Sequence, residues 1–231
     1  MKKVAKWGLL LFSLMVLFLV GDPAKVNAAT KAEYTYKTYD KSKTYKGKKS
    51  TIKDIEKYKR VILKGDSDAV KKINAVLKAE CDAKLADMPA GYAKNDADMM
   101  GYDSQYSNTY TSKVTYNDNG VISIRINFEW YQGGTADYGW DCYTFDLTTG
   151  DQLQLTDVCK GSNASLSKKI KNKLVKKYSK DAFFADKLDK ITAKDSEFYL
   201  NKNGKAVVTF DKYEISYGAA GAFTVTLNSK Y

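Results

Sequence analysis

Two alternating stretches joined by a four-residue turn sequence constrain the fold of this chain most. Residues 106–116 and 121–131 alternate apolar and polar side chains with the period of two that is typical of β-strands. Between them stands Asn117-Asp118-Asn119-Gly120, and Asn-Gly readily supplies the positive φ angles of a tight hairpin turn. One face of the second stretch is predicted to point into the core, and it carries Ile122, Ile124, Ile126, Phe128 and Trp130.

Further strands are predicted along the rest of the chain. They are residues 52–63, a second hairpin of 138–147 with 152–158, a third hairpin of 198–200 with 206–210, and a last strand at 223–227. Residues 213–215 extend the pattern of 206–210. Gly218 and Gly221 then interrupt it where the chain has to bend or pass close to other backbone.

Two amphipathic helices accompany these strands. The first has its apolar stripe at Val70, Ile73, Leu77, Cys81 and Leu85, and the second at Leu166, Ile170, Leu174 and Tyr178. Ser162 or Asn163 is suited to cap the second helix. Residues 90–104 are predicted as a polar loop, and residues 183–188 as a short helical piece. Hairpins and helices are segregated along the chain, so the fold class is α+β, with antiparallel hairpins or sheets packed against two main helices.

The N-terminus indicates export. Lys2, Lys3 and Lys6 precede an apolar run over residues 7–20, which is short for a membrane span of roughly 20 residues. Val26-Asn27-Ala28 then offers the small residues that a signal peptidase accepts. We therefore expect a cleaved signal peptide at residues 1–28 and a secreted, wall-associated protein without a stable membrane span. An uncleaved anchor is the alternative.

The secreted part is expected to have two regions. Residues 29–50 consist mainly of Lys, Thr and Tyr and are predicted to form a basic, loosely attached arm. Residues 51–231 form the α+β domain, either as one unit or as two subdomains, 51–135 and 136–231. Processing removes four lysines and one aspartate from a chain of net charge +11, which leaves about +8. Anionic wall polymers are therefore suitable partners, and nucleic acid is not expected.

The chain contains no histidine, which excludes Ser-His-Asp and Cys-His catalysis and His-ligated zinc. A carboxylate pair could still hydrolyse glycosides, and the nearest candidates are Asp137 with Asp141 and Asp211 with Glu214. Asp96, Asp98 and Asp103 lack the spacing of a known calcium loop. We predict no catalytic residue, no metal and no cofactor.

Three cysteines allow one disulfide bond in an exported protein. Cys81 lies on the apolar stripe of the first helix and is predicted to be a small core residue. Cys142 and Cys159 flank the second hairpin, where antiparallel pairing brings their surroundings together. We predict that these two form the disulfide.

Several short motifs along the chain, taken in order, resemble those of one domain family. The segment from Phe210 to Gly221 reads FDKYEISYGAAG, and it is preceded by Ile73-Asn74, Gly133-Gly134, Phe145-Asp146-Leu147-Thr148-Thr149-Gly150 and Leu155-Thr156-Asp157. In this order they resemble the extracellular domain of lysozyme-sensing anti-sigma factors and of the accessory region of a peptidoglycan deacetylase, the RsiV/PdaC-type domain. The resemblance runs from about residue 58 to 227. It departs after the glycine pair, where Thr135-Ala136-Asp137 stands in place of the Ala-His that the family often carries.

The resemblance and the missing catalytic groups predict a secreted, non-catalytic binding module at the bacterial cell envelope. Its recognition surface is expected at Tyr131, Asp137, Tyr138, Trp140 and Asp141, because aromatic side chains provide contact area at low entropic cost. The expected ligand is an anionic wall polymer or peptidoglycan, ranked above a protein such as lysozyme. Lysozyme is itself strongly cationic and would need an acidic patch, for which Asp137, Asp141 and Asp146 are candidates. A carboxylate-dependent wall or polysaccharide hydrolase is the alternative.

Overall fold

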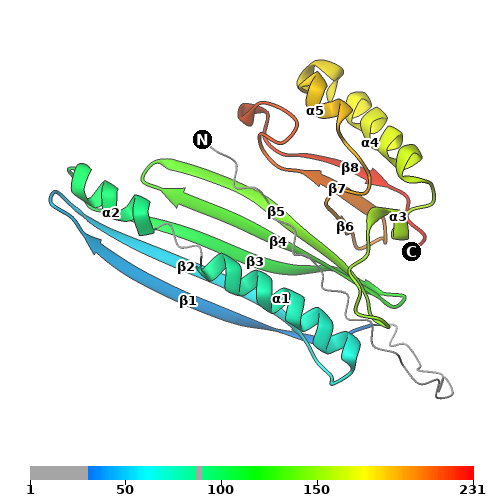
Figure 1. Cartoon of the computed structure of the whole chain (residues 1–231), viewed down its shortest axis with the longest axis horizontal. Coiled ribbons are helices and arrows are strands. Elements are labelled where there is room, and N and C mark those ends of the chain that lie inside the picture. The colour runs from blue at the N-terminus through cyan, green and yellow to red at the C-terminus, as the bar shows by residue number, and fades with distance from the viewer. Residues whose placement is uncertain (1–30, 87–89) are drawn as a thin grey trace, which may run out of the picture.

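The computed structural model describes residues 31–86 and 90–231 and has a mixed α+β architecture (Figure 1). The strands are β1 (Tyr34–Lys46), β2 (Thr51–Leu63), β3 (Ser104–Asp118), β4 (Val121–Gln132), β5 (Thr135–Asp146), β6 (Phe198–Leu200), β7 (Ala206–Phe210) and β8 (Phe223–Leu227). The helices are α1 (Asp68–Ala86), α2 (Ala90–Met99), α3 (Leu155–Val158), α4 (Asn163–Tyr178) and α5 (Ala185–Asp189), with the 3-10 turns η1 (Lys180–Ala182) and η2 (Gly218–Ala220). The predicted signal peptide lies outside the described residues. Within the described part, no helix combines the length and the apolar character needed to cross a membrane.

The first sheet has five strands in the order β1-β2-β3-β4-β5. The turn between β3 and β4 is confirmed, with φ angles of 51° at Asn119 and 73° at Gly120. Not every neighbouring pair is antiparallel, because β2 and β3 run parallel. The chain leaves β2, forms α1 and α2, and re-enters the sheet in the same direction, as a parallel pair requires.

Helix α1 packs on one face of this sheet and buries the predicted stripe. Ile73, Leu77 and Cys81 join a core cluster with the alternate isoleucines of β4. Ile122, Ile124 and Ile126 are fully buried, which confirms the face predicted for β4. Phe128 and Trp130 lie further along the same face and are half-buried.

Two segments differ from the sequence prediction. Residues 34–46, expected within a loose arm, pair with β2 along the whole of β1. Thr and Tyr favour strands, and backbone pairing provides the hydrogen bonds that a segment with few apolar groups needs. Residues 90–99, expected as a polar loop, form α2, whose Ala93 and Ala97 pack in a small cluster with Tyr45, Ile52 and Tyr106.

The second sheet is antiparallel, in the order β6-β7-β8, and α4 and α5 cover it (Figure 1). Ser162 caps α4 as predicted, since its hydroxyl accepts the Ser165 N–H at 3.3 Å. Leu166, Ile170 and Leu174 are buried against the sheet. The extension of β7 over residues 213–215 does not form, because the chain turns there.

The two sheets meet through β6, which contacts β3, β4 and β5. The Leu200 N–H of β6 donates to Ser123 Oγ of β4 at 2.9 Å, and this hydroxyl lies 2.8 Å from Thr144 Oγ1 of β5. Because β5 belongs to the first sheet, a subdomain boundary between residues 135 and 136 does not match the architecture.

The predicted disulfide does not form, and Cys81, Cys142 and Cys159 are all free and buried. The hairpin expected to bring Cys142 and Cys159 together is limited to a single bridge between Phe145 and Gln152. The chain then turns into α3, which carries Cys159 into the core of the second sheet. Cys142 stays on β5 with Arg125 opposite.

Candidate functional site

A groove with a volume of about 460 Å³ opens at the end of the first sheet where the turn joins β4 to β5. We call it the tyrosine groove. Strands β3, β4 and β5 form its floor, and the loop after β7 forms one wall. Its lining residues are Ser107, Thr109, Glu129, Trp130, Tyr131, Ala136, Asp137, Tyr138 and Lys212.

The strand register explains why these side chains meet. Glu129 lies opposite Tyr138, and Tyr131 lies opposite Ala136, in the β4–β5 pair. Residues directly opposite each other share a face of a sheet. Thr109 lies opposite Glu129 on the other side, so polar and aromatic groups of three strands meet on the face away from α1.

The loop over residues 211–221 is held against β5 by specific contacts. Lys212 Nζ lies 3.3 Å from Asp137 Oδ1, and Asp211 Oδ1 accepts the Trp140 N–H at 3.2 Å. Gly139 permits this approach, because a Cβ there would come within 2.8 Å of Asp211 Oδ1. The C-terminal motif and the β4–β5 hairpin, noticed separately in the sequence, therefore form one site.

The same loop presents two tyrosines that sequence reasoning did not select. Tyr213 and Tyr217 are 60% and 66% exposed, more than Tyr131 and Tyr138 with 43% and 48%. Tyr213 has a φ of 69°, a backbone conformation that is uncommon for a bulky side chain. Such outliers cluster at functional sites. The glycine at 218 in the same motif was the available indication, because the Tyr213 ring packs over it.

The structure brings together only part of the predicted recognition surface. Tyr131, Asp137 and Tyr138 line the tyrosine groove. Trp140 is half-buried nearer the second sheet, with the Arg125 guanidinium 5.6 Å from its ring centre. Asp141 points to the opposite face, where its Oδ2 lies 3.1 Å from Lys84 Nζ of α1. Adjacent residues of a strand point to opposite faces, which separates these two side chains.

The acidic patch considered for a cationic partner is not assembled. Asp137 is paired with Lys212 of the loop after β7, and Asp141 with Lys84 of α1. Asp146 accepts the backbone N–H groups of Thr148 and Thr149 at the turn after β5. The three carboxylates thus serve three separate local contacts.

Among the titratable groups of this loop, Asp211 has the most strongly shifted pKa. Burial raises its pKa to about 6, helped by the nearby carboxylates of Glu197 and Glu214 and opposed by the hydrogen bond from Trp140. Glu214 Oε2 accepts the backbone N–H of Asp211 at 2.8 Å. Both members of this carboxylate pair therefore make hydrogen bonds that shape the loop.

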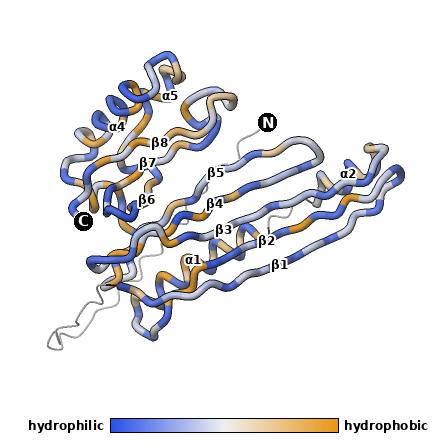
Figure 2. Tube along the Cα trace, turned by 180° about the vertical axis from the view of Figure 1, so that it is seen from behind, coloured by the Kyte–Doolittle hydropathy of each residue, from blue (hydrophilic) through white to orange (hydrophobic). Residues whose placement is uncertain are grey.

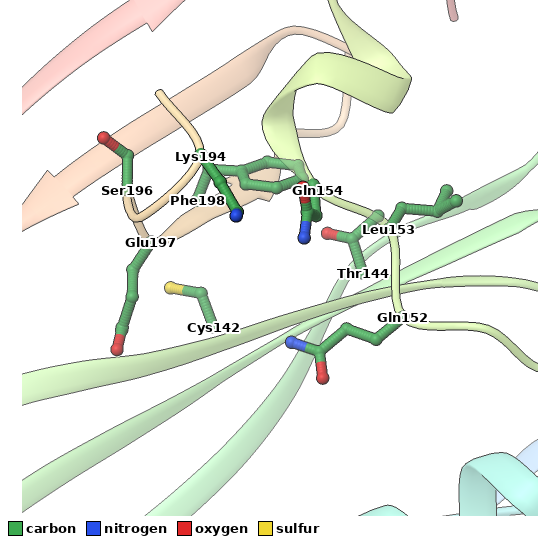
Figure 3. A pocket seen from close by; sticks show the side chains of 9 residues that line it. All are labelled: Cys142, Thr144, Gln152, Leu153, Gln154, Lys194, Ser196, Glu197 and Phe198. Carbon is green, nitrogen blue, oxygen red and sulfur yellow. The ribbon is translucent and has the colours of Figure 1, made fainter. Parts of the chain in front are cut away.

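A second hollow of about 370 Å³ lies between β5 and the segment before β6. Figure 3 shows Cys142 of β5, Gln152 and Gln154 of the segment before α3, and Lys194 of the segment before β6 around this hollow. Burial, with a smaller contribution from Glu197, raises the pKa of the Cys142 thiol far above its ordinary value. The thiol is therefore kept protonated, whereas a cysteine nucleophile must be a thiolate.

Each of the three aspartates in or near α2 accepts a hydrogen bond from a different residue. Asp98 Oδ1 accepts the Lys48 N–H at 2.9 Å, Asp103 Oδ1 accepts the Thr51 N–H at 2.7 Å, and Asp96 accepts the Tyr106 hydroxyl. Across residues 31–86 and 90–231, no group of three or more His, Cys, Asp or Glu side chains is arranged to hold a metal ion.

The family match of this chain lies in its C-terminal part, whereas the structural similarity covers most of it. Residues 156–230 match the model of a family described as protein of unknown function DUF3298. No curated protein matches the chain. A solved DUF3298 family member from Bacteroides fragilis is similar with a TM-score of 0.63 at 15% identity, covering 87% of this chain and 92% of that one. A DUF3298 family protein from Pseudomonas aeruginosa has a TM-score of 0.49 at 14% identity, with 87% and 93% covered.

At 15% identity the similarity to the Bacteroides fragilis structure shows a shared fold alone. The finer resemblance to domains of anti-sigma factors and a deacetylase stays a prediction. The tyrosine groove combines a hairpin outside the matched segment with a loop inside it. Residues 156–230 of this chain thus match the DUF3298 domain, and the chain has the fold of a solved DUF3298 family member.

Proposed function

We propose that this chain is an exported, non-catalytic binding module that acts at the bacterial cell envelope and holds a sugar-containing wall polymer in the tyrosine groove. The observation that carries the proposal is the pairing of exposed Tyr131 and Tyr138 with Glu129 and the Asp137–Lys212 ion pair around one hollow. Tyrosine rings offer flat faces with a negative quadrupole, against which the C–H groups of sugar rings can pack. Carboxylates accept hydrogen bonds from hydroxyl groups, and an ammonium donates them.

Charge favours a wall polymer over lysozyme. The chain has a net charge of +11, and the acidic residues that would have to attract a cationic protein are dispersed. Long-range electrostatics therefore oppose an encounter with a cationic partner and favour one with an anionic polymer. The resemblance to extracellular RsiV/PdaC-type domains and the expected signal peptide support a location at the envelope.

The contacts favour binding over hydrolysis. Hydrolysis of glycosides requires two carboxyl groups that flank a bond and are free to exchange protons and attack or activate water. Asp137 and Asp141 each pair with a different lysine, Lys212 and Lys84, and Asp211 and Glu214 make hydrogen bonds within the loop and to β5. These side chains have structural roles that a catalytic role would disrupt.

Sedimentation of the purified full chain with bacterial cell walls tests the proposal. The parent chain should co-sediment with walls, and the double variant Tyr131→Ala/Tyr138→Ala should lose most of this binding with a nearly unchanged thermal midpoint. Tyr102→Ala is the matched control, because Tyr102 is 59% exposed and is not among the groove residues. Its wall binding should equal that of the parent.

Immobilised lysozyme and reducing-end assays complete the test. Salt-insensitive capture of lysozyme without retention on walls would overturn the proposal in favour of a lysozyme-binding module. Release of reducing ends that is lost in Asp137→Asn or Asp211→Asn would overturn it in favour of the hydrolase.

A further inference from the structure

Helix α4 lies within the stretch of the described chain that has the most lysines without an acidic residue between them. Between Lys160 and Lys180 the sequence has eight lysines and no aspartate or glutamate. In Figure 2 the α4 tube is blue along much of its length. The apolar face of the helix is already used, because Leu166, Ile170 and Leu174 are buried against the second sheet.

Three of these lysines form a line. Lys169, Lys173 and Lys176 are exposed and follow one another at i, i+4 and i+7, so consecutive members are neighbours on the helix surface, about 5–6 Å apart at their Cβ atoms. We call them the lysine ridge. Lys171 and Lys177 are not part of it, because their ammonium groups donate to the carbonyl oxygens of Asp189 and Thr224.

The charge of the ridge is not balanced within the fold. Among the ion pairs of the described residues, none involves a lysine of α4. Like charges at i and i+4 destabilise a helix by a few tenths of a kcal/mol per pair. The helix macrodipole favours Lys176 near the C-terminus, yet it does not favour Lys169 in the first half of the helix. Helix stability alone therefore does not explain this arrangement.

We propose that the lysine ridge is a second binding site, which takes an anionic polymer with repeated phosphate groups. This inference rests on the proposed envelope function and adds the chemistry of the charged part of the ligand. A row of ammonium groups on one face of a helix can contact successive phosphates of a flexible chain, each as a charge-assisted hydrogen bond. The tyrosine groove and the ridge lie on different elements, so variants can change each site separately.

A polymer fits this surface better than a lipid bilayer does. An interfacial helix inserts an apolar face into the membrane. The apolar face of α4 is packed in the core and is not available for insertion. The ridge therefore offers charge alone, which suits a soluble or wall-linked polyanion.

Binding of inorganic polyphosphate to the full chain tests the ridge. The variant is Lys169→Gln/Lys173→Gln/Lys176→Gln, since glutamine retains helix propensity. Its matched control is Lys46→Gln/Lys53→Gln/Lys57→Gln, which removes the same charge from exposed lysines of the first sheet. At low salt the ridge variant should bind polyphosphate about tenfold more weakly, and the control should stay within about threefold of the parent. Both differences should shrink as salt rises, because exposed charges are screened over about 8 Å at physiological ionic strength.

The outcomes separate the ridge from the groove. Polyphosphate contains no sugar, so Tyr131→Ala/Tyr138→Ala should bind it like the parent. The proposal for the ridge would be overturned if the ridge variant and its control lost equal affinity for polyphosphate. It would also be overturned if the protein bound vesicles of anionic phosphatidylglycerol but not polyphosphate. If polyphosphate binding depends on the ridge but the protein does not sediment with walls, the ridge is a polyanion site and the proposed envelope function is wrong. A thermal midpoint of the ridge variant at or above that of the parent shows that the variant is folded.

Discussion

The ring of Tyr213 occupies the space that a side chain at Gly218 would need. A Cβ at residue 218 would lie 1.9 Å from Tyr213 Cζ and 2.3 Å from its hydroxyl oxygen. Gly218 is itself buried, and Tyr213 reaches it from a backbone with positive φ. This contact fixes the shape of the loop that walls the tyrosine groove.

Gly218→Ala should therefore displace the Tyr213 ring and weaken wall binding. The Tyr213 ring is 60% exposed and can turn toward solvent, so the cost should lie near the lower end of the about 1–3 kcal/mol of overpacking, which lowers the thermal midpoint by a few degrees. Calorimetry and wall sedimentation measure the two effects. Gly101→Ala is the control, because no atom lies within 4 Å of a Cβ at that position. Equal stability and binding in both variants would show that the contact does not shape the loop.

Trp140→Ala should mainly lower stability and Tyr138→Ala should mainly weaken wall binding, although both residues were predicted for the same surface. Trp140 is half-buried beside Arg125, whose guanidinium also lies near the ring of Tyr199, so loss of Trp140 should cost about 2 kcal/mol of unfolding free energy. Tyr138 is 48% exposed at the groove, so its loss should weaken wall binding with little change in stability. Denaturant unfolding and wall binding of both variants check this. A stable Trp140→Ala that fails to bind would instead place Trp140 in the recognition surface.

Ser123→Ala should weaken the connection between the two sheets. Its hydroxyl accepts the Leu200 N–H and is fully buried, so removal leaves a buried donor without a partner. Such a group costs about 1–3 kcal/mol. The free energy of unfolding should fall by this amount, and amide exchange in β6 should become faster. Ser42→Ala, at an exposed position on β1, should show neither change.

Asp211 should make the protein less stable at neutral pH than in mild acid. Its folded pKa of about 6 lies above its ordinary value of 3.8, so between these values the folded state binds more protons than the unfolded state. The contribution of this group to stability is present below pH 4 and is lost as the pH rises through about 6. Asp211→Asn keeps an oxygen for the Trp140 N–H and removes the buried charge. The variant should gain stability relative to the parent at pH 7, and unfolding curves at pH 4 to 7 measure the difference. A pH dependence identical to that of the parent would contradict the assignment to Asp211.

The sequence was informative where a pattern is local. Asn119-Gly120 and the stripes that contain Ile73 and Leu166 predicted the central hairpin and both main helices, because turn geometry and helical periodicity depend on neighbouring residues. The parallel pairing of β2 with β3 was missed, since both partners belong to segments separated by two helices. Strand β1 was missed because its pairing uses the backbone, on which composition gives little information.

The candidate site was predictable only in part for the same reason. Tyr131, Asp137 and Tyr138 were found from their aromatic and loop character. Their association with Lys212 depends on a loop about 75 residues further along the chain, and no local pattern indicates such a contact. Asp141 was misplaced because the face of β5 that it occupies depends on the register with β4.

Strand β1 forms one border of the first sheet, and its thirteen residues have a partner on one side only. An unpaired border of this length offers a row of backbone donors and acceptors to any other extended chain, and such borders promote aggregation. Lys37, Lys41, Lys43 and Lys46 are spread along β1, and all four are exposed. Two copies that approached border to border would bring these ammonium groups together. The basic composition of β1 thus protects the protein against adding its own copies to the sheet.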